Sequence, residues 1–106
     1  MQSNFVNISA TETKSALETN GKIVLLDVRT PKEIAEGKIQ NALEIDYKEE
    51  DFKSNLSKLN KDDAYIVYCR SGRRSAETSQ MMTEMGFKDV KNLEGGILAW
   101  NELNKK

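Results

Sequence analysis

The sequence predicts an α/β fold with a parallel sheet, and two observations lead to this prediction. Short apolar runs, such as residues 23–28 and 64–68, alternate along the chain with helical patterns of about ten residues. Such alternation is typical of βαβ units, in which a helix connects two parallel strands. The chain has 106 residues, enough for one hydrophobic core, and shows no internal repeat or linker. We therefore expect a single domain over residues 1–106.

Two capping boxes mark helix starts in the first half of the chain. Residues 9–12 (Ser-Ala-Thr-Glu) open a helix that is expected to end near Asn20. Residues 23–28 follow as a strand buried on both faces. Residues 30–33 (Thr-Pro-Lys-Glu) form the second capping box, with proline at the first helical position, and this short helix is expected to end at Gly37.

The second half of the chain continues the alternation. Phe52, Leu56 and Leu59 lie at i, i+4 and i+7, which predicts one apolar face of a helix. Gly95-Gly96 introduces a terminal helix. The expected elements are strands over 42–45, 64–68 and 89–93, and helices over 48–60, over 75–85 and from residue 97 onward.

Composition argues against several classes of function. The chain has 12 Lys and 4 Arg against 17 acidic residues, a net charge of −1, whereas an electrostatic nucleic-acid binder has a basic excess. No apolar run approaches the roughly 20 residues that cross a bilayer. Residues 1–4 lack the basic and apolar regions of a signal peptide. We therefore expect a cytoplasmic protein that binds neither nucleic acid nor membrane.

Two residue counts narrow the chemistry further. The chain contains no histidine, which excludes Ser-His-Asp and Cys-His nucleophiles and histidine-containing metal sites. It contains one cysteine, Cys69, so an internal disulfide, a CxxC redox pair and a thiolate zinc site are excluded as well. We expect no metal site, and any covalent thiol chemistry must use Cys69.

Cys69 lies in a context that favours a reactive thiol, although a lone cysteine in such a domain is usually a small buried hydrophobe. It follows the strand at 64–68 rather than lying within it, so we expect it to reach the surface. Gly72 permits a tight loop whose N–H groups can converge on one point. A helix is expected to begin directly afterwards, and the partial positive charge at its N-terminus favours a thiolate.

Three of the four arginines lie within five residues of Cys69. The planar guanidinium binds oxyanions in a bidentate manner, whereas the chain uses lysine for most of its other positive charges. The sequence therefore predicts a thiolate of low pKa in an anion-binding loop, with Cys69 as the catalytic nucleophile. The candidate substrate-binding residues are Arg70, Ser71, Gly72, Arg73, Arg74 and Ser75.

The length of this loop distinguishes two enzyme classes. Cysteine-dependent phosphatases use C-x5-R, because their loop must surround the oxygens of a phosphate. Here the sixth residue after Cys69 is Ser75, and the arginine comes one residue earlier, at Arg74. The shorter C-x4-R loop is better matched to a single sulfur atom carried on the thiolate, which favours persulfide chemistry.

Three segments, in this order and spacing, resemble the single-domain rhodaneses, which are sulfurtransferases. The segments are residues 26–33 (LDVRTPKE), 69–75 (CRSGRRS) and 93–100 (LEGGILAW). The resemblance spans a core of about residues 7–103 and implies a mainly parallel five-stranded sheet flanked by helices on both faces. It also implies that Cys69 takes a sulfane sulfur from a donor such as thiosulfate and passes it to cyanide or a thiol. This ping-pong cycle requires no cofactor.

Two further segments bear on the resemblance. Asp27 and Arg29 end a buried strand, and we expect them mainly to hold the next helix in place, as supporting residues beside the loop. Many rhodaneses have Gly-His-Ile-Pro-Gly-Ala where residues 37–42 here read Gly-Lys-Ile-Gln-Asn-Ala. That histidine does not carry sulfur, so we expect the reaction to persist with a less firmly fixed turn.

Two alternatives to a sulfurtransferase remain. The first is a phosphatase or arsenate reductase of the related longer-loop fold, which Ser75 argues against. The second is a non-enzymatic rhodanese-like binding or regulatory module, which the retained Cys69 and arginine-rich loop argue against. The expected partners are a small anionic sulfur donor and a thiol acceptor or sulfur-relay protein, and we expect a monomer.

Overall fold

A five-stranded sheet forms the centre of the computed structural model, which describes residues 5–105. The strand order is β1-β5-β4-β2-β3, and every neighbouring pair is parallel. All strands therefore have their carboxyl ends at the same edge, where open α/β sheets place their ligand sites. The strands are β1 (Val6–Ile8), β2 (Val24–Asp27), β3 (Leu43–Glu44), β4 (Ala64–Tyr68) and β5 (Asp89–Leu93).

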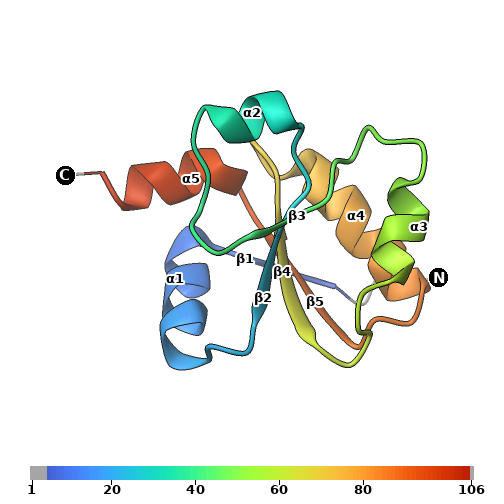
Figure 1. The fold of residues 1–106 in the computed structure, drawn as a ribbon. Coiled ribbons are helices and arrows are strands. Elements are labelled where there is room, and N and C mark those ends of the chain that lie inside the picture. Colours follow the sequence, from blue (N-terminus) through green and yellow to red (C-terminus); the bar gives the residue numbers. More distant parts are fainter. Residues whose placement is uncertain (1–4, 106) are drawn as a thin grey trace.

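Helices cover both faces of this sheet, as expected for parallel strands that are buried on both sides. Figure 1 shows α1 and α5 on one face, α3 and α4 on the other, and α2 beside the edge that holds the carboxyl ends. Both predicted capping boxes are present, with Ser9 opening α1 and Thr30 opening α2. The helices are α1 (Ala10–Thr19), α2 (Pro31–Ala35), α3 (Phe52–Ser57), α4 (Arg73–Glu84) and α5 (Gly96–Leu103).

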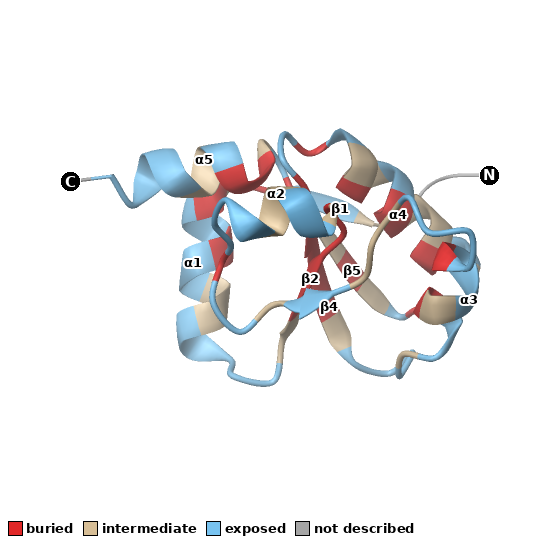
Figure 2. Ribbon diagram, turned by 45° about the horizontal axis from the view of Figure 1, so that its top comes forward, coloured by how far each residue is buried: buried red, intermediate tan, exposed pale blue. Residues whose placement is uncertain are grey.

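The central strands are buried on both faces, because their side chains alternate between two cores. Figure 2 shows the burial concentrated in the strands and in the inward sides of the helices. The core beneath α3 and α4 contains Leu26, Tyr65, Val67, Met82 and Val90 among others. The core beneath α1 and α5 contains Leu25, Ile66, Tyr68, Leu93 and Ile97 among others.

The main differences from the sequence prediction concern β1, α3 and α4. Strand β1 is not indicated by the local pattern, because only Ile8 of its three residues is buried. The helix expected over 48–60 is limited to α3, since the acidic segment before Phe52 forms turns and Asp51 makes no side-chain cap. Helix α4 begins at Arg73, two residues earlier than predicted, so Ser75 belongs to its first turn.

The turn that departs from the rhodanese pattern keeps a left-handed residue. Asn41 has φ 68°, at the position where the compared pattern has glycine. Asparagine tolerates this conformation better than most residues, which accounts for the substitution. Lys38, at the position of the missing histidine, pairs with Glu44 at 2.6 Å on the surface.

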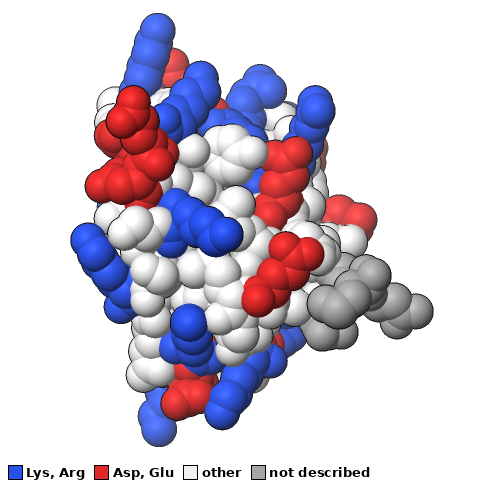
Figure 3. All heavy atoms as spheres, turned by 90° about the vertical axis from the view of Figure 1, so that its right-hand side faces the viewer, with Lys and Arg blue, Asp and Glu red and all other residues white. Residues whose placement is uncertain are grey.

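The outer surface mixes charges of both signs. Figure 3 shows basic and acidic side chains interspersed over the face of α3 and α4, with several basic ones along the edge of the carboxyl ends. Within residues 5–105, no helix has the length and apolar character to cross a membrane. The expectation about a signal peptide concerns residues 1–4, which lie outside the described residues.

Candidate active site

Cys69 follows β4 directly and begins the loop that leads into α4. Its expected exposure was wrong, because the residue is only 1% exposed. The loop curls around the sulfur, and the N-terminus of α5 closes over the same loop. The N–H of Ile97 donates to the carbonyl of Cys69 at 2.9 Å, and the N–H of Leu98 donates to that of Arg70 at 3.2 Å. The start of α5 therefore holds the loop backbone in place.

Three hydrogen-bond donors converge on the Cys69 sulfur. The Gly72 N–H lies 3.1 Å from Sγ, and both the N–H and the hydroxyl of Ser75 lie 3.4 Å from it. Burial raises the pKa of the thiol, but the hydrogen bonds from Ser75, Gly72 and Ser71 outweigh burial, so the Cys69 pKa lies below its ordinary value. The loop thus stabilises a thiolate mainly through backbone and hydroxyl dipoles.

Two glycines allow this loop to form. Gly72 has φ 105° and caps α4, and a side chain there would meet the Gly95 nitrogen at 3.0 Å. Gly96 has φ 61°, and a Cβ at this position would collide with the carbonyls of Cys69 and Arg70. Both positions need glycine for conformation and for close backbone approach.

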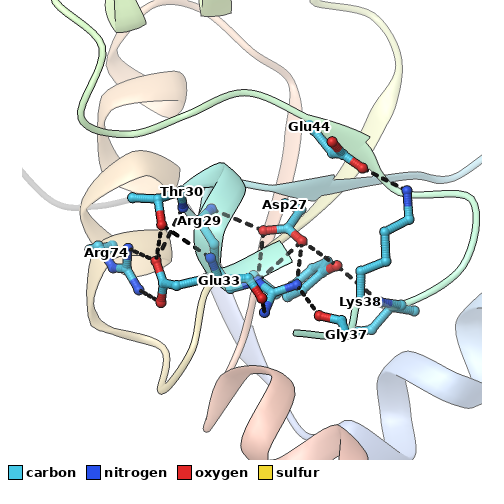
Figure 4. A network of polar contacts seen from close by, with 10 residues as sticks. Asp27, Arg29, Thr30, Glu33, Gly37, Lys38, Glu44 and Arg74 are labelled. Atoms are coloured by element: carbon cyan, nitrogen blue, oxygen red, sulfur yellow. Dashed lines mark hydrogen bonds and ion pairs between the residues drawn. The ribbon is translucent and has the colours of Figure 1, made fainter. Parts of the chain in front are cut away.

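The three arginines of the loop occupy different environments. Arg70 and Arg73 are exposed, whereas Arg74 is half-buried. Arg74 donates two hydrogen bonds to Glu33, at 2.8 and 2.7 Å, in a bidentate pair (Figure 4). The hydrogen bonds from Arg74 hold the pKa of Glu33 down at about 2. Arg74 therefore links α4 to α2, while Arg70 and Arg73 remain open to solvent.

A buried polar cluster supports the loop from the side of α2 (Figure 4). Arg29 donates to both carboxylate oxygens of Asp27, with the shortest contact at 2.8 Å, and the hydroxyl of Tyr68 donates to Asp27 at 2.6 Å. Arg29 also donates to the carbonyls of Glu33 and Gly37. These bonds hold α2 and the turn after it. Tyr68 precedes Cys69, so the cluster also fixes the end of β4.

Comparison with known proteins assigns this arrangement to a family. The family model of the rhodanese-like domain matches residues 9–103. The chain belongs to the rhodanese family. YtwF of Bacillus subtilis is 40% identical over 93 residues, which cover 88% of this chain and 87% of YtwF. A protein of Allochromatium vinosum named "Sulfurtransferase" is 40% identical over 78 residues, covering 74% of this chain and 71% of that protein.

Solved structures agree with the family assignment. The crystal structure of a rhodanese-like domain protein from Staphylococcus aureus superimposes with a TM-score of 0.80 and 34% sequence identity. The superposition covers 91% of each chain. The five-stranded parallel sheet with helices on both faces is therefore the rhodanese fold.

A pocket of about 480 Å³ adjoins the rhodanese loop between α2 and α5. Arg70 lies on the loop side of this pocket, Glu36 lies at the end of α2, and Leu98 and Asn101 lie on α5. Leu98 is 46% exposed. The pocket therefore offers an approach to the loop that combines a guanidinium with an apolar wall.

Three residues near the loop were not predicted to act on it. Glu33 was expected only as a helix cap, and Gly96 only as part of the glycine pair that introduces the last helix. Asn92, whose side chain donates to the Gly72 carbonyl, carried no sequence signal, because its strand mixes polar and apolar residues and its partner lies 20 residues away. The partner of Glu33 lies 41 residues away, so local patterns could not reveal the pair. Gly72 and Gly96 are the positions where the sequence carries a signal for close backbone approach.

Substituting Glu33 with Gln is expected to change the pH dependence of stability. The folded pKa of Glu33 is lowered from 4.5 to about 2, so its stabilising contribution is present above pH 4.5 and is lost as the pH falls toward 2. Glu33→Gln should therefore be less stable than wild type at neutral pH, and the difference should shrink in acid. Thermal unfolding between pH 7 and pH 3 measures this. A constant difference across that range would contradict the pairing.

Proposed function

We propose that this protein is a sulfurtransferase that carries a sulfane sulfur on Cys69. The observation that carries the proposal is the convergence of the Gly72 and Ser75 donors on one buried sulfur, within a C-x4-R loop. Such donors stabilise negative charge on sulfur without requiring a base, and the chain has no histidine to provide one. The name of the Allochromatium vinosum relative supports the same reaction class.

The reaction has two balanced steps. In the first, the Cys69 thiolate attacks the outer sulfur of an anionic donor such as thiosulfate. The new S–S bond forms as the donor's own S–S bond breaks, and sulfite leaves with the electron pair. In the second, a thiolate or cyanide attacks the outer sulfur of the persulfide and regenerates the Cys69 thiolate. Cyanide becomes thiocyanate, and a thiol becomes a new persulfide.

The surroundings of Cys69 assign roles to the loop. The N–H groups that face Sγ are placed to stabilise charge on the cysteine sulfur and on the sulfur it carries. Arg70 and Arg73 are free to attract and orient the anionic donor, while Arg74 keeps the loop joined to α2. The chain has no second cysteine, so an external thiol or a sulfur-relay protein must receive the sulfur.

An intact mass spectrum tests the proposal directly. The purified protein is measured without reductant, after thiosulfate, and again after cyanide. We expect a gain of one sulfur atom with thiosulfate, and its loss with cyanide as thiocyanate appears. Because Cys69 is the only cysteine, the added sulfur needs no further assignment. Failure to gain sulfur from thiosulfate or from a persulfide donor, together with hydrolysis of an aryl phosphate, would overturn the proposal in favour of a phosphatase.

Replacing Arg70 and Arg73 by lysine is expected to raise the KM for thiosulfate severalfold while leaving the acceptor step unchanged. Lysine keeps the charge but loses the bidentate fork that matches an oxyanion. Steady-state kinetics with varied thiosulfate and cyanide separate the two steps. Lys88→Arg is the matched control, since Lys88 is an exposed lysine that pairs with Asp62. An unchanged KM would show that the guanidinium geometry is irrelevant to donor binding.

A further inference from the structure

Asn92 is a buried polar residue next to the loop that begins at Cys69. It lies on β5, is 3% exposed, and shares a face of the strand with Val90, which packs in the core beneath α3 and α4. Its side-chain nitrogen donates to the carbonyl of Gly72 at 3.3 Å and to the side-chain oxygen of Asn7 at 3.0 Å. Asn92 therefore connects the loop to β5 and to the edge strand β1.

The orientation of the Asn92 amide is determined by Gly72. A backbone carbonyl can only accept a hydrogen bond, so the NH₂ group must face it. The side-chain oxygen of Asn92 is then left without a hydrogen-bond partner, alone among the buried side-chain polar atoms of residues 5–105. An unsatisfied buried oxygen costs free energy, and an apolar residue would avoid that cost. The two hydrogen bonds that the NH₂ group donates offset this cost.

Gly72 is the residue of the loop that most needs such an anchor. Its N–H faces the Cys69 sulfur at 3.1 Å, and its φ of 105° is one that glycine adopts without strain but does not hold by itself. Its carbonyl accepts from the N–H of Ala76, the first hydrogen bond of α4, and from Asn92. The Gly72 carbonyl belongs to the peptide that joins Gly72 to Arg73, whereas its N–H belongs to the preceding peptide. Two donors on the carbonyl therefore fix the peptide on one side of the Gly72 Cα and restrict how the peptide that carries the N–H can turn.

We propose that Asn92 is a positioning residue of the site, which holds Gly72 so that the Gly72 N–H points at the Cys69 sulfur. Asn92 does not touch the reacting sulfur and acts only through the loop. Its relevance to catalysis rests on the proposed sulfurtransferase function. Its effect on the thiol does not, because the ionisation of Cys69 can be measured without any sulfur transfer.

The test is a pH titration of Cys69, in which the rate of alkylation with iodoacetamide is measured at each pH. The single cysteine makes this rate specific to the site. Asn92→Leu and Asn92→Val remove the NH₂ group and keep an apolar side chain suited to a buried strand, so that one variant serves if the other fails to fold. Val90→Ala is the matched control, because it weakens the same strand on the same face without touching the loop hydrogen bonds.

In the Asn92 variants, the apparent pKa of Cys69 is expected to rise by about one unit, as for the loss of one hydrogen bond to a thiolate. At a pH below the wild-type pKa of Cys69, the rate of persulfide formation from thiosulfate should be about tenfold lower than in wild type. The rate should recover at alkaline pH, where the thiolate is restored. Val90→Ala should lower stability and leave the titration unchanged. The proposal is overturned if the folded Asn92 variants titrate like wild type, or if Val90→Ala shifts the pKa equally.

The same experiment separates this proposal from the function. If wild type gains no sulfur but the Asn92 variants raise the pKa of Cys69, the positioning role stands and the sulfurtransferase function fails. If wild type gains sulfur and the variants leave the pKa unchanged, the function stands and the positioning role fails.

Discussion

Cys69→Ser is expected to abolish the gain of sulfur from thiosulfate and the formation of thiocyanate. A serine hydroxyl is not ionised near neutral pH, and it cannot carry a sulfane sulfur as a persulfide. The fold should persist, because a serine oxygen can accept the same hydrogen bonds from Gly72 and Ser75 that now reach the sulfur. Intact mass and a thiocyanate assay measure the chemistry. Sulfur transfer by this variant would contradict the assignment of Cys69.

The stability of Cys69→Ser provides an independent check on the thiol. The pKa of Cys69 in the folded chain lies below its ordinary value of 9, so ionisation stabilises the fold above that value. This contribution is lost as the pH falls through the folded pKa. Wild type should therefore gain stability relative to Cys69→Ser as the pH is raised toward 9. A difference that does not depend on pH would show that the folded and unfolded thiols ionise alike.

The source of the lowered Cys69 pKa differs from the one that the arginine-rich loop suggested. The hydrogen bonds from Ser75, Gly72 and Ser71 are what offset the burial of the sulfur. Arg74, which is near enough to interact with the thiolate, is bound to Glu33. The hydrogen-bond donors of the loop and of the first turn of α4 thus stabilise the thiolate. In the proposed reaction, Arg70 and Arg73 are then available to bind the anionic sulfur donor.

Local sequence signals predicted most of the fold. The capping boxes at Ser9 and Thr30 are each a four-residue pattern, and both helices begin where the pattern places them. The apolar run of β4 and the position of Cys69 at its end were also visible, because strand and loop follow each other directly in the chain. Cys69 was therefore placed correctly at the carboxyl edge of the sheet.

The features that were not predicted depend on contacts between distant segments. Strand β1 is stabilised by pairing with β5, in which Asn7 lies beside Asn92, 85 residues further along the chain. The three residues of β1 are too few to show a strand pattern by themselves. The burial of Cys69 depends on the start of α5, whose N–H groups bind the loop carbonyls. No local pattern contains either contact. Both therefore required the arrangement of the whole sheet.

Asp27→Asn is expected to destabilise the protein by about 3–5 kcal/mol, a large part of the stability of a domain this size. Asp27 is fully buried, and Arg29 is 4% exposed. The asparagine would leave the Arg29 guanidinium as an uncompensated buried charge and would remove an acceptor from the hydroxyl of Tyr68. Denaturant unfolding measures the loss. Because Tyr68 precedes Cys69, sulfur transfer should also weaken in the protein that remains folded.

Two comparisons identify the buried charge as the cause. Asp62→Asn removes a carboxylate from an exposed pair with Lys88 and should cost less than about 1 kcal/mol. The double variant Asp27→Leu with Arg29→Met removes both charges, so it should be more stable than Asp27→Asn alone, because no unpaired ion remains. The single variants Asp27→Leu and Arg29→Met are measured as well. If the double variant lost as much stability as these two single variants added together, the cost would arise from packing. The Asp27–Arg29 pair would then owe its importance to shape and to the carbonyls that Arg29 holds in the turn after α2.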